Sequence, residues 1–474
     1  MSAATMLRFT GVDQAYPTKR VAAERADDFL EIARPYLTAK AEEQASRCSQ
    51  CGVPFCQVHC PLHNNIPDWL RLTGEGRLEE AYEASAATST MPEICGRICP
   101  QDRLCEGNCV IEPGFGAVTI GSVEKFINDH AWDMGWVKPV RIAADRSGQS
   151  VGIIGAGPAG LTAAELLRVK GYAVHVYDRH DRAGGLLTYG IPGFKLEKAV
   201  VARRVARLEA AGIVFHHEFA VGRDASLGEL RSRHDAVLIA TGVYAARDVA
   251  VPGVEADGVV PALDYLIASN RRGFGEAVDG FDAAGKHVVV IGGGDTAMDC
   301  VRTAVRQGAA SVKCLYRRDR GNMPGSAREV AHAKEEGVEF VWLSAPAAFE
   351  GSPVTHVRVQ RMRLGPADAS GRRAPEADPA GTERLPADLV IKALGFDAED
   401  LPKLFGAPDL SVTRWGTLRV DHASMMTNLP GVFAAGDIVR GASLVVWAIR
   451  DGRDVAKAIH LYMAAQVGAT RAAA

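Results

Sequence analysis

Ten cysteines stand in this chain of 474 residues, and eight of them lie between Cys48 and Cys109. They form two runs with short spacings, C-x2-C-x4-C-x3-C-P ending at Pro61 and C-x3-C-x5-C-x3-C beginning at Cys95. Disulfide frameworks belong to small secreted domains, whereas this chain is long and its N-terminus lacks the basic and apolar regions of a secretory signal. Thiolates at these spacings suit a metal centre instead, either zinc or an iron–sulfur cluster.

The run that ends in Cys60-Pro61 is similar to the ferredoxin run, whose last cysteine ligates a second cluster. If Cys60 crosses over in this way, one centre takes three cysteines of the first run and needs a fourth from the second: Cys48, Cys51, Cys56 and Cys109. The other centre then takes Cys60, Cys99, Cys105 and one more ligand, for which counting offers Cys95. Zinc remains the alternative, although it has no redox chemistry and could only be structural.

Residues 151–178 have the pattern of a dinucleotide-binding unit, with an apolar strand, a glycine-rich turn, a helix and a second strand. The turn, Gly155-Ala-Gly157-Pro158-Ala159-Gly160, fits G-x-G-x-x-G, which brings a pyrophosphate to the N-terminus of the helix. Asp178 ends the second strand, 23 residues after Gly155, where an acid accepts hydrogen bonds from a ribose. A lone glycine motif could be a structural turn, but the strand, helix and acid in register favour a nucleotide site.

Further motifs identify this first nucleotide as FAD. Gly185-Leu186 follows Asp178 closely, Thr241-Gly242 ends a later strand, and Gly436-Asp437 ends a strand near the C-terminus. The set resembles flavoproteins of the disulfide-reductase type, which carry two dinucleotide-binding domains. In them the residue that matches Asp437 bonds the ribitol chain of the flavin; a helix N-cap is the structural alternative for this aspartate.

A second unit begins with the strand 287–292 and the turn Gly292-Gly-Gly294-Asp295-Thr296-Ala297, which fits G-x-G-x-x-A. The next strand ends in Arg317-Arg318 rather than in an acid. A guanidinium binds a 2′-phosphate with two parallel hydrogen bonds, so the pair favours NADPH over NADH. Two solvated surface arginines are the alternative.

These motifs must be positioned by about three domains, because 474 residues are too many for one core. Helical periodicity in 21–40, which Pro35 interrupts, and in 67–84 predicts a helical N-terminal block. The two βαβ units predict an α/β fold with parallel sheets. We expect a helical 4Fe–4S domain over 1–145, an FAD-binding domain over 146–248 and 406–474, and an NADPH-binding domain over 249–405 inserted into it. Residues 365–381, rich in Pro, Ala, Arg and Gly, predict a solvated hairpin or loop.

Charge and hydropathy exclude several function classes. The net charge is −3, which gives no electrostatic reason to expect nucleic acid or an anionic membrane as partner. No apolar run approaches the roughly 18 residues that span a bilayer. The sequence therefore predicts a soluble, cytoplasmic protein.

The combination of motifs resembles the small (β) subunits of bacterial NADPH-dependent glutamate synthases over nearly the whole chain. The same module is similar to the N-terminal half of dihydropyrimidine dehydrogenase and to the large subunit of NADH-dependent ferredoxin:NADP oxidoreductase. The resemblance implies two 4Fe–4S clusters, the first on Cys48, Cys51, Cys56 and Cys109. For the second it implies Cys60, Cys99, Cys105 and a non-cysteine ligand, a glutamine in dihydropyrimidine dehydrogenase, which matches Glu124 and makes it our choice over Cys95. It also places Leu186, Lys195 and the backbone of Val221 near FAD.

The resemblance further implies an electron-input subunit without a catalytic side chain, since hydride transfer from NADPH to FAD needs positioning rather than a protein nucleophile. Single electrons would pass through the clusters to an FMN-containing α subunit that makes L-glutamate from 2-oxoglutarate and L-glutamine. Cys300 and Cys314 are separated by 13 residues, so they form no C-x-x-C dithiol. The alternatives are an NADPH:ferredoxin oxidoreductase, stand-alone or bifurcating, and a zinc-containing adaptor that is not an enzyme.

Overall fold

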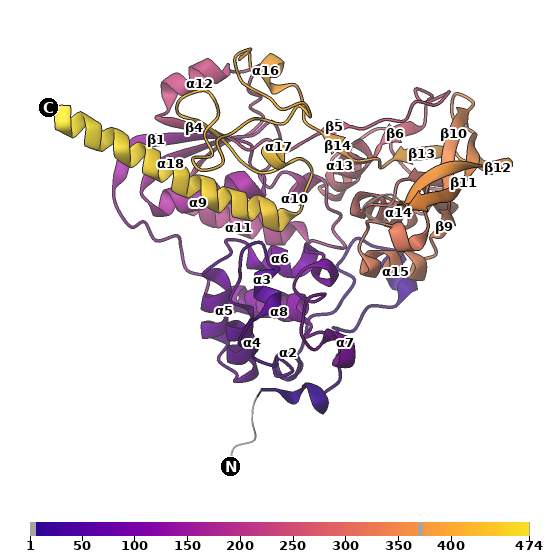
Figure 1. The fold of residues 1–474 in the computed structure, drawn as a ribbon, viewed down its shortest axis with the longest axis horizontal. Coiled ribbons are helices and arrows are strands. Elements are labelled where there is room, and N and C mark those ends of the chain that lie inside the picture. The colour runs from indigo at the N-terminus through magenta and orange to yellow at the C-terminus, as the bar shows by residue number, and fades with distance from the viewer. Residues whose placement is uncertain (1–5, 368–372, 474) are drawn as a thin grey trace.

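A computed structural model describes residues 6–367 and 373–473, which fold into three lobes that meet at a central junction (Figure 1). The N-terminal lobe is built from short helices and loops. Its helices are α1 (Ala22–Ala26), α2 (Thr38–Ala45), α3 (Phe55–Val58), α4 (Ile66–Gly74), α5 (Leu78–Ala86), α6 (Pro92–Ile98), α7 (Glu112–Phe115) and α8 (Ile120–Asp133). The periodicity over 21–40 thus yields the short α1 and the beginning of α2, and Pro35 lies in the non-helical segment between them because its ring cannot continue a helix.

The second lobe contains a five-stranded sheet in the order β15-β4-β1-β2-β3, and every neighbouring pair is parallel. Its strands are β1 (Arg146–Ile154), β2 (Tyr172–Tyr177), β3 (Val214–His216), β4 (Ala236–Ile239) and β15 (Val432–Ala434). Its helices are α9 (Pro158–Val169), α10 (Leu186–Tyr189), α11 (Lys198–Ala210), α12 (Leu227–Arg233), α17 (Asp437–Arg440) and α18 (Val445–Ala473). The last strand returns from the far end of the chain, so this lobe is interrupted by the third one.

Alternate residues of β1 face opposite layers of this lobe, as the period of a strand requires. Val151 and Ile153 pack among residues of α9, α11 and α18. Ile154 packs with Leu227 and Leu230 of α12 on the other face. The sheet is therefore covered on both sides, which explains the continuous apolar runs of its strands.

The third lobe holds a second parallel sheet in the order β6-β13-β7-β8-β9. Its strands are β6 (Val259–Pro261), β7 (His287–Ile291), β8 (Ser311–Tyr316), β9 (Glu339–Trp342) and β13 (Leu389–Lys392), and its helices are α13 (Ala262–Gly273), α14 (Asp295–Arg306) and α15 (Ala327–Glu335). The helices cover one face. The other face packs against a three-stranded antiparallel sheet of β10 (Ser344–Glu350), β11 (His356–Ala367) and β12 (Arg373–Pro386).

The chain crosses between the second and third lobes twice, and the crossings pair with each other as β5 (Ala245–Ala246) and β14 (Phe396–Asp397), before α16 (Leu401–Leu404). The α/β class with one nucleotide-type unit inserted in the other is confirmed. The segment 365–381 is a hairpin of two long strands, β11 and β12, with residues 368–372 outside the described part of the chain. Among the described helices, none combines the length and the apolar character that a bilayer crossing needs.

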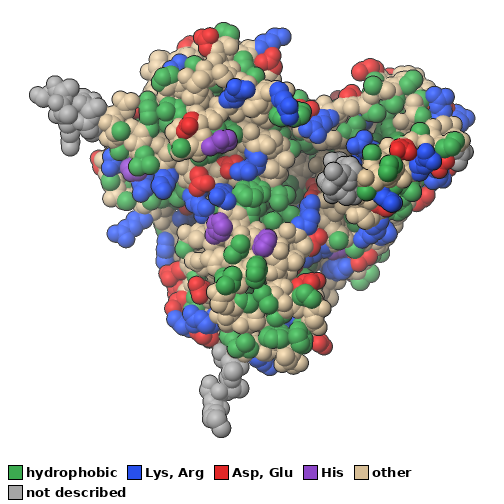
Figure 2. Space-filling model, in the orientation of Figure 1, with side chains coloured by type: hydrophobic (Ala, Val, Ile, Leu, Met, Phe, Trp, Pro, Cys, Tyr) green, Lys and Arg blue, Asp and Glu red, His purple; other side chains and the backbone are tan. Residues whose placement is uncertain are grey.

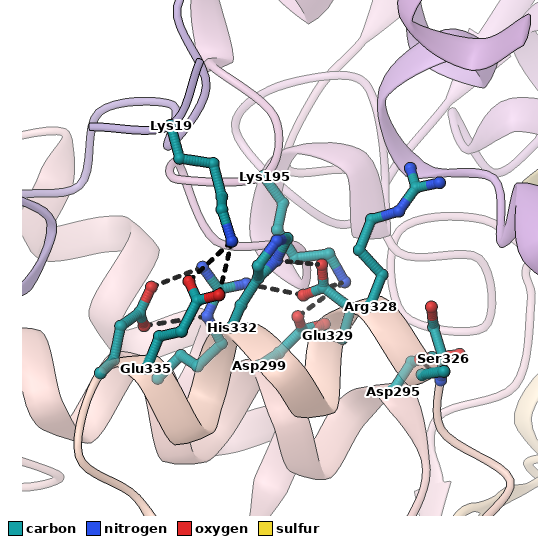
Figure 3. Close-up of polar contacts among 12 residues, drawn as sticks. Lys19, Lys195, Asp295, Asp299, Ser326, Arg328, Glu329, His332 and Glu335 are labelled. Carbon is teal, nitrogen blue, oxygen red and sulfur yellow. Dashed lines mark hydrogen bonds and ion pairs between the residues drawn. The ribbon is translucent and has the colours of Figure 1, made fainter. Parts of the chain in front are cut away.

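Helix α15 of the third lobe is fastened to the N-terminal lobe at both ends (Figures 1 and 3). At its C-terminal end, Glu335 accepts from Lys19 at 2.5 Å and from Arg25 at 2.8 Å. Near its N-terminal end, Arg328 donates to Glu106 at 2.8 Å. These contacts join segments more than two hundred residues apart and fix how the lobes are oriented.

A buried carboxylate, that of Glu336, directly follows the contact of Glu335 at the C-terminal end of α15. Glu336, whose side chain has no exposed surface, accepts from Arg302 at 2.9 Å and from Arg306 at 2.7 Å. Arg25 from the N-terminal lobe approaches the same carboxylate at 3.4 Å. Burial by itself would raise the pKa of Glu336, but the hydrogen bonds from Arg306 and Arg302 outweigh it and lower the pKa from 4.5 to about 2.

We predict that Glu336→Gln destabilises the protein by about 3–5 kcal/mol, because it leaves buried guanidinium groups without their counter-charge. Glu335→Gln is the matched control, since Glu335 is 40% exposed and its ion pair should contribute about 0–1 kcal/mol. Because the pKa of Glu336 in the folded state lies below the unfolded value, its stabilisation is complete above about pH 4.5 and is lost as the pH falls toward about 2.

Urea unfolding of both variants at neutral pH and at about pH 4 measures these differences. The loss in the free energy of unfolding caused by Glu336→Gln should be smaller at the lower pH. Equal stability of the two variants at neutral pH would show that the buried cluster is not what joins the lobes.

Candidate functional site

Four thiols of the N-terminal lobe gather from two distant loops. Cys48 follows α2, Cys56 lies in α3, and Cys109 precedes α7. The thiols of Cys48 and Cys56 each interact electrostatically with those of Cys51 and Cys109. Gln50 donates from Nε2 to Cys48 Sγ at 3.2 Å. Hydrogen bonds of this kind to sulfur stabilise thiolates and tune the potential of a cluster that they ligate.

The other predicted ligands form a second group beside the first. Cys99 is hydrogen-bonded to Cys95 and interacts electrostatically with Cys105 and Glu124. Cys60 lies near Glu124 and Cys95, and Cys105 lies near Glu124 and Cys60. Cys60, the last cysteine of the first run, thus lies beside members of the second group. Both candidates for the fourth ligand are present there.

Glu124 reaches this group from α8, which lies against α6 at very short distance. A Cβ placed on Gly96 of α6 would lie 2.6 Å from the backbone nitrogen of Lys125, so only glycine permits this approach. Burial, together with the negative charge of Glu93, raises the pKa of Glu124 to about 8. Asn64 donates to its Oε1 at 2.9 Å. A carboxyl group that is buried beside thiols and held in place by an amide suits a metal ligand.

A single zinc ion would require its ligands to lie close to one another. Tetrahedral zinc with Zn–S bonds of about 2.3 Å would draw its four sulfurs to about 3.8 Å from one another. Within residues 6–367 and 373–473, no three Cys, His, Asp or Glu side chains are close enough to hold one metal ion.

The first glycine-rich turn lies between β1 and α9 and has room for a phosphate. Gly155 has a φ of +106°, and a Cβ there would lie 2.4 Å from the carbonyl oxygen of Ala240. A Cβ on Gly160 would lie 2.0 Å from the carbonyl oxygen of Gly155. A Cβ on Gly157, by contrast, would meet no atom within 4 Å. The open side of the turn therefore faces a space beside the N-terminus of α9, where unpaired N–H groups favour an anion.

Beside this turn lies a cavity of about 310 Å³, which several predicted residues line: Gly155, Asp178, Val221 and Thr241. Asp178 accepts from the backbone N–H of Ala156 at 2.7 Å, so the acid also fastens the turn. Thr241 has a buried hydroxyl without a hydrogen-bond partner, a group that a bound ligand would satisfy.

The sequence analysis missed two residues that line this cavity. The guanidinium carbon of Arg179 lies over the ring of Tyr244, 4.4 Å from its centroid. In the chain, Arg179 follows Asp178, and Tyr244 comes three residues after Thr241. A flat aromatic ring with a cation on it suits the adenine end of a dinucleotide. Their positions directly after two recognised motifs were the available signal.

The remaining FAD candidates border the turn from other segments. A Cβ on Gly185, just before Leu186, would lie 2.9 Å from the Cα of Gly157. Gly436 has a φ of +79°, and a Cβ there would lie 3.0 Å from the Cβ of Ala159. Burial raises the pKa of the next residue, Asp437, which accepts from Ser443 Oγ at 2.7 Å. Pro158 and Gly160 belong to the first turn of α9, and Gly242 follows Thr241 in the chain.

Lys195 lies between the second and third lobes (Figure 3). Its ammonium donates to Asp299 of α14 at 2.8 Å and lies 3.7 Å from Glu329 of α15. Burial opposes its charge, but these carboxylates raise its pKa. Lys195 therefore ties the two nucleotide-binding lobes together.

The second glycine-rich turn repeats the geometry of the first. Gly292 has a φ of +143°, and a Cβ there would lie 2.2 Å from the carbonyl oxygen of Ala393. A Cβ on Gly294 would meet nothing within 4 Å. Asp295 and Thr296 begin α14 beside this open side, and Ala297 is fully buried against the sheet.

Arg317 and Arg318 follow β8, which pairs in parallel with β7, so they lie at the same sheet edge as the second turn. Arg317 is exposed, and Arg318 has a buried Nε without a hydrogen-bond partner. Among the described residues, neither guanidinium forms an ion pair with a carboxylate. Two uncompensated cations at the ribose edge fit a 2′-phosphate.

Two family descriptions match the chain. Residues 25–136 match "dihydropyrimidine dehydrogenase domain II, 4Fe-4S cluster". Residues 149–452 match "pyridine nucleotide-disulphide oxidoreductase". These matches support a 4Fe–4S cluster in the N-terminal lobe and a flavin- and pyridine-nucleotide-binding unit in the rest, and they argue against the zinc adaptor.

Solved structures agree with this fold. FprA from Mycobacterium tuberculosis, solved in complex with NADPH, superposes with a TM-score of 0.57 at 22% identity, over 68% of this chain and 86% of that chain. At this identity the likeness shows the fold alone.

Curated relatives match along the full length. The glutamate synthase (NADPH) small chain of Azospirillum brasilense is 66% identical over 99% of this chain and 98% of its own. That of Escherichia coli K12 is 46% identical over 95% of this chain and 98% of its own. The putative oxidoreductase AegA of the same organism is also 46% identical, but this match covers 69% of that protein. The chain belongs to the family of glutamate synthase (NADPH) small chains.

Proposed function

We propose that this chain is the electron-input subunit of a glutamate synthase, which oxidises NADPH and delivers electrons to a large chain. The observation that carries the proposal is the presence, in one polypeptide, of two open glycine-rich turns and two separate groups of thiols. The small-chain name of its relatives implies a larger partner, and we propose that this partner carries FMN and makes L-glutamate from 2-oxoglutarate and L-glutamine.

When bound, FAD supplies a hydride acceptor that can release electrons singly, and 4Fe–4S clusters supply one-electron carriers. The protein residues contribute binding and orientation. The N-termini of α9 and α14 bind the two pyrophosphates, and Asp178 bonds the ribose of FAD. Lys195 and Asp299 hold the two nucleotide-binding lobes in a fixed relation, which hydride transfer requires because the reacting atoms must be about 3–3.5 Å apart.

The metal sites that we propose are Cys48, Cys51, Cys56 and Cys109 for one cluster, and Cys60, Cys99, Cys105 and Glu124 for the other. Their chemistry supports this assignment, since buried thiols with N–H donors on sulfur are the usual environment of such clusters. Exposed apolar side chains lie beside these cysteines: Val53, Phe55, Val58 and Val110. Figure 2 shows apolar side chains gathered on the N-terminal lobe, and a surface of this kind suits a docked protein partner.

The function is tested with the full chain, purified without the large partner. We expect FAD, about eight irons from two 4Fe–4S clusters, and loss of the visible flavin band on anaerobic addition of NADPH. A colourless protein, or a flavin that NADPH leaves oxidised, would refute the proposal. Co-purification with an FMN-containing large chain separates it from an NADPH:ferredoxin oxidoreductase, which would need no such partner.

We predict that Arg317→Ala combined with Arg318→Ala weakens NADPH binding by about 10- to 100-fold, because charge-assisted hydrogen bonds to a 2′-phosphate are lost. The affinity for NADH should change little, since NADH lacks that phosphate. Michaelis constants for both nucleotides, obtained from the rate of flavin reduction, provide the comparison. Equal losses for both would assign the arginines to another role.

We predict that Glu124→Ala lowers the iron content from about eight to about four per chain, because one cluster loses its fourth ligand. Cys95→Ala should keep about eight irons, since Cys95 then serves only as a packed thiol in the same pocket. Iron analysis and low-temperature EPR of the reduced variants distinguish the two. About four irons in Cys95→Ala and about eight in Glu124→Ala would make Cys95 the ligand.

A further inference from the structure

The loop between two proposed cluster ligands reaches into the other nucleotide-binding lobe. Arg103 lies between Cys99 and Cys105, and its guanidinium donates to Asp295 Oδ2 at 3.0 Å and to the carbonyl oxygen of Pro324 at 2.7 Å. Asp295 is the first residue of α14, directly after the second glycine-rich turn. An arginine of the N-terminal lobe therefore borders the proposed NADPH site.

Asp295 places a negative charge close to the position that the negatively charged pyrophosphate of the nucleotide would occupy. The open side of the turn at Gly294 and the first N–H groups of α14 would receive the pyrophosphate. The carboxylate is held in place at a half-buried position, since its Oδ1 accepts from the backbone N–H of Ser326 at 2.8 Å and 35% of the side chain is exposed. A carboxylate fixed within one helical turn of two phosphates repels them unless a cation compensates it.

The same loop also supports the segment that closes over the turn. Gly325 donates to the carbonyl oxygen of Gly293 at 2.8 Å. Asp102 accepts from the hydroxyl of Ser326 at 3.3 Å and from the backbone N–H of Ala327 at 3.2 Å, at the beginning of α15. Residues of the N-terminal lobe thus hold both the turn and the segment packed on it.

We propose that Arg103 is a positioning residue for NADPH, contributed by the iron–sulfur lobe, which neutralises Asp295 so that the pyrophosphate can approach α14. The second nucleotide site is thereby composite, with its charge balance completed by the loop that also ligates a cluster. This inference rests on the proposed function, because it takes the second turn to be the NADPH site.

The test measures the dissociation constant of NADP⁺ by calorimetry on the full chain with its cofactors bound. Arg103→Gln keeps a polar, though shorter, side chain and removes its charge. It should weaken binding about threefold to tenfold, as the loss of a charge near a helix terminus does. Arg103→Lys should stay within about twofold of the wild type, since it keeps the charge. Arg77→Gln is the control: Arg77 forms exposed ion pairs with Glu75 and Glu80 of the same lobe, and its variant should bind normally.

Variants that restore the net charge of the site distinguish this role from a purely structural contact. Asp295→Asn keeps the acceptor for Ser326 but removes the charge, so it should bind NADP⁺ at least as tightly as the wild type. The double variant Arg103→Gln/Asp295→Asn should return to within about twofold of the wild type, because the site regains its net charge. In the single Arg103→Gln variant, the Michaelis constant for NADPH should rise while the limiting rate of flavin reduction is unchanged.

Wild-type affinity in Arg103→Gln, equal losses in Arg103→Gln and Arg103→Lys, or a double variant weaker than Arg103→Gln would each overturn the proposal. Loss of NADP⁺ binding in Asp295→Asn would do the same, because it would make the carboxylate itself a ligand of the nucleotide. Failure of the wild-type protein to bind NADP⁺ would instead refute the proposed function.

Discussion

The buried carboxylate of Glu336 is the point on which the arrangement of the three lobes depends. It lies at the end of α15, and guanidinium groups from α14 and from the N-terminal lobe converge on it. Buried charges are tolerated only when they are paired, so none of these segments can move away without leaving an uncompensated ion. The free-energy cost of separating these charges makes the relative orientation of the segments more specific than apolar packing alone would.

The orientation that results has a chemical consequence. Lys195 from the second lobe meets Asp299 and Glu329 from the third, next to Arg302, which bonds both Glu329 and Glu336. The two helices are therefore held by the iron–sulfur lobe and by the flavin-type lobe through one connected network of charges. A nucleotide on the N-terminus of α14 is presented in a fixed orientation, and hydride transfer depends on such positioning.

The two groups of thiols lie in the N-terminal lobe, which extends away from this junction. The second group contains Cys99 and Cys105, whose connecting loop contacts the third lobe through Arg103. The first group lies among exposed apolar side chains such as Phe55 and Val110. The two groups therefore differ in what surrounds them, the second bordering the third lobe and the first bordering the exposed surface.

Much of the fold could be predicted because its signals are local. The strands at 151–154 and 287–291 appear as apolar runs, since both faces of a parallel sheet are covered. The glycines at 155 and 292 are required by positive φ and by neighbouring carbonyls. The period over 21–40 misled, because a helical pattern does not fix helix length where prolines and tertiary contacts hold the chain extended.

The sequence by itself determined the types of site, through cysteine spacing, glycine turns and the arginines after β8, because these patterns are short and their chemistry is set by residue type. Only the tertiary structure decided which thiols gather, that Lys195 bridges two lobes, and that Arg103 borders the second turn. The physical reason is that charge pairing and close approach depend on distances between residues far apart in the chain, and no local pattern records those distances.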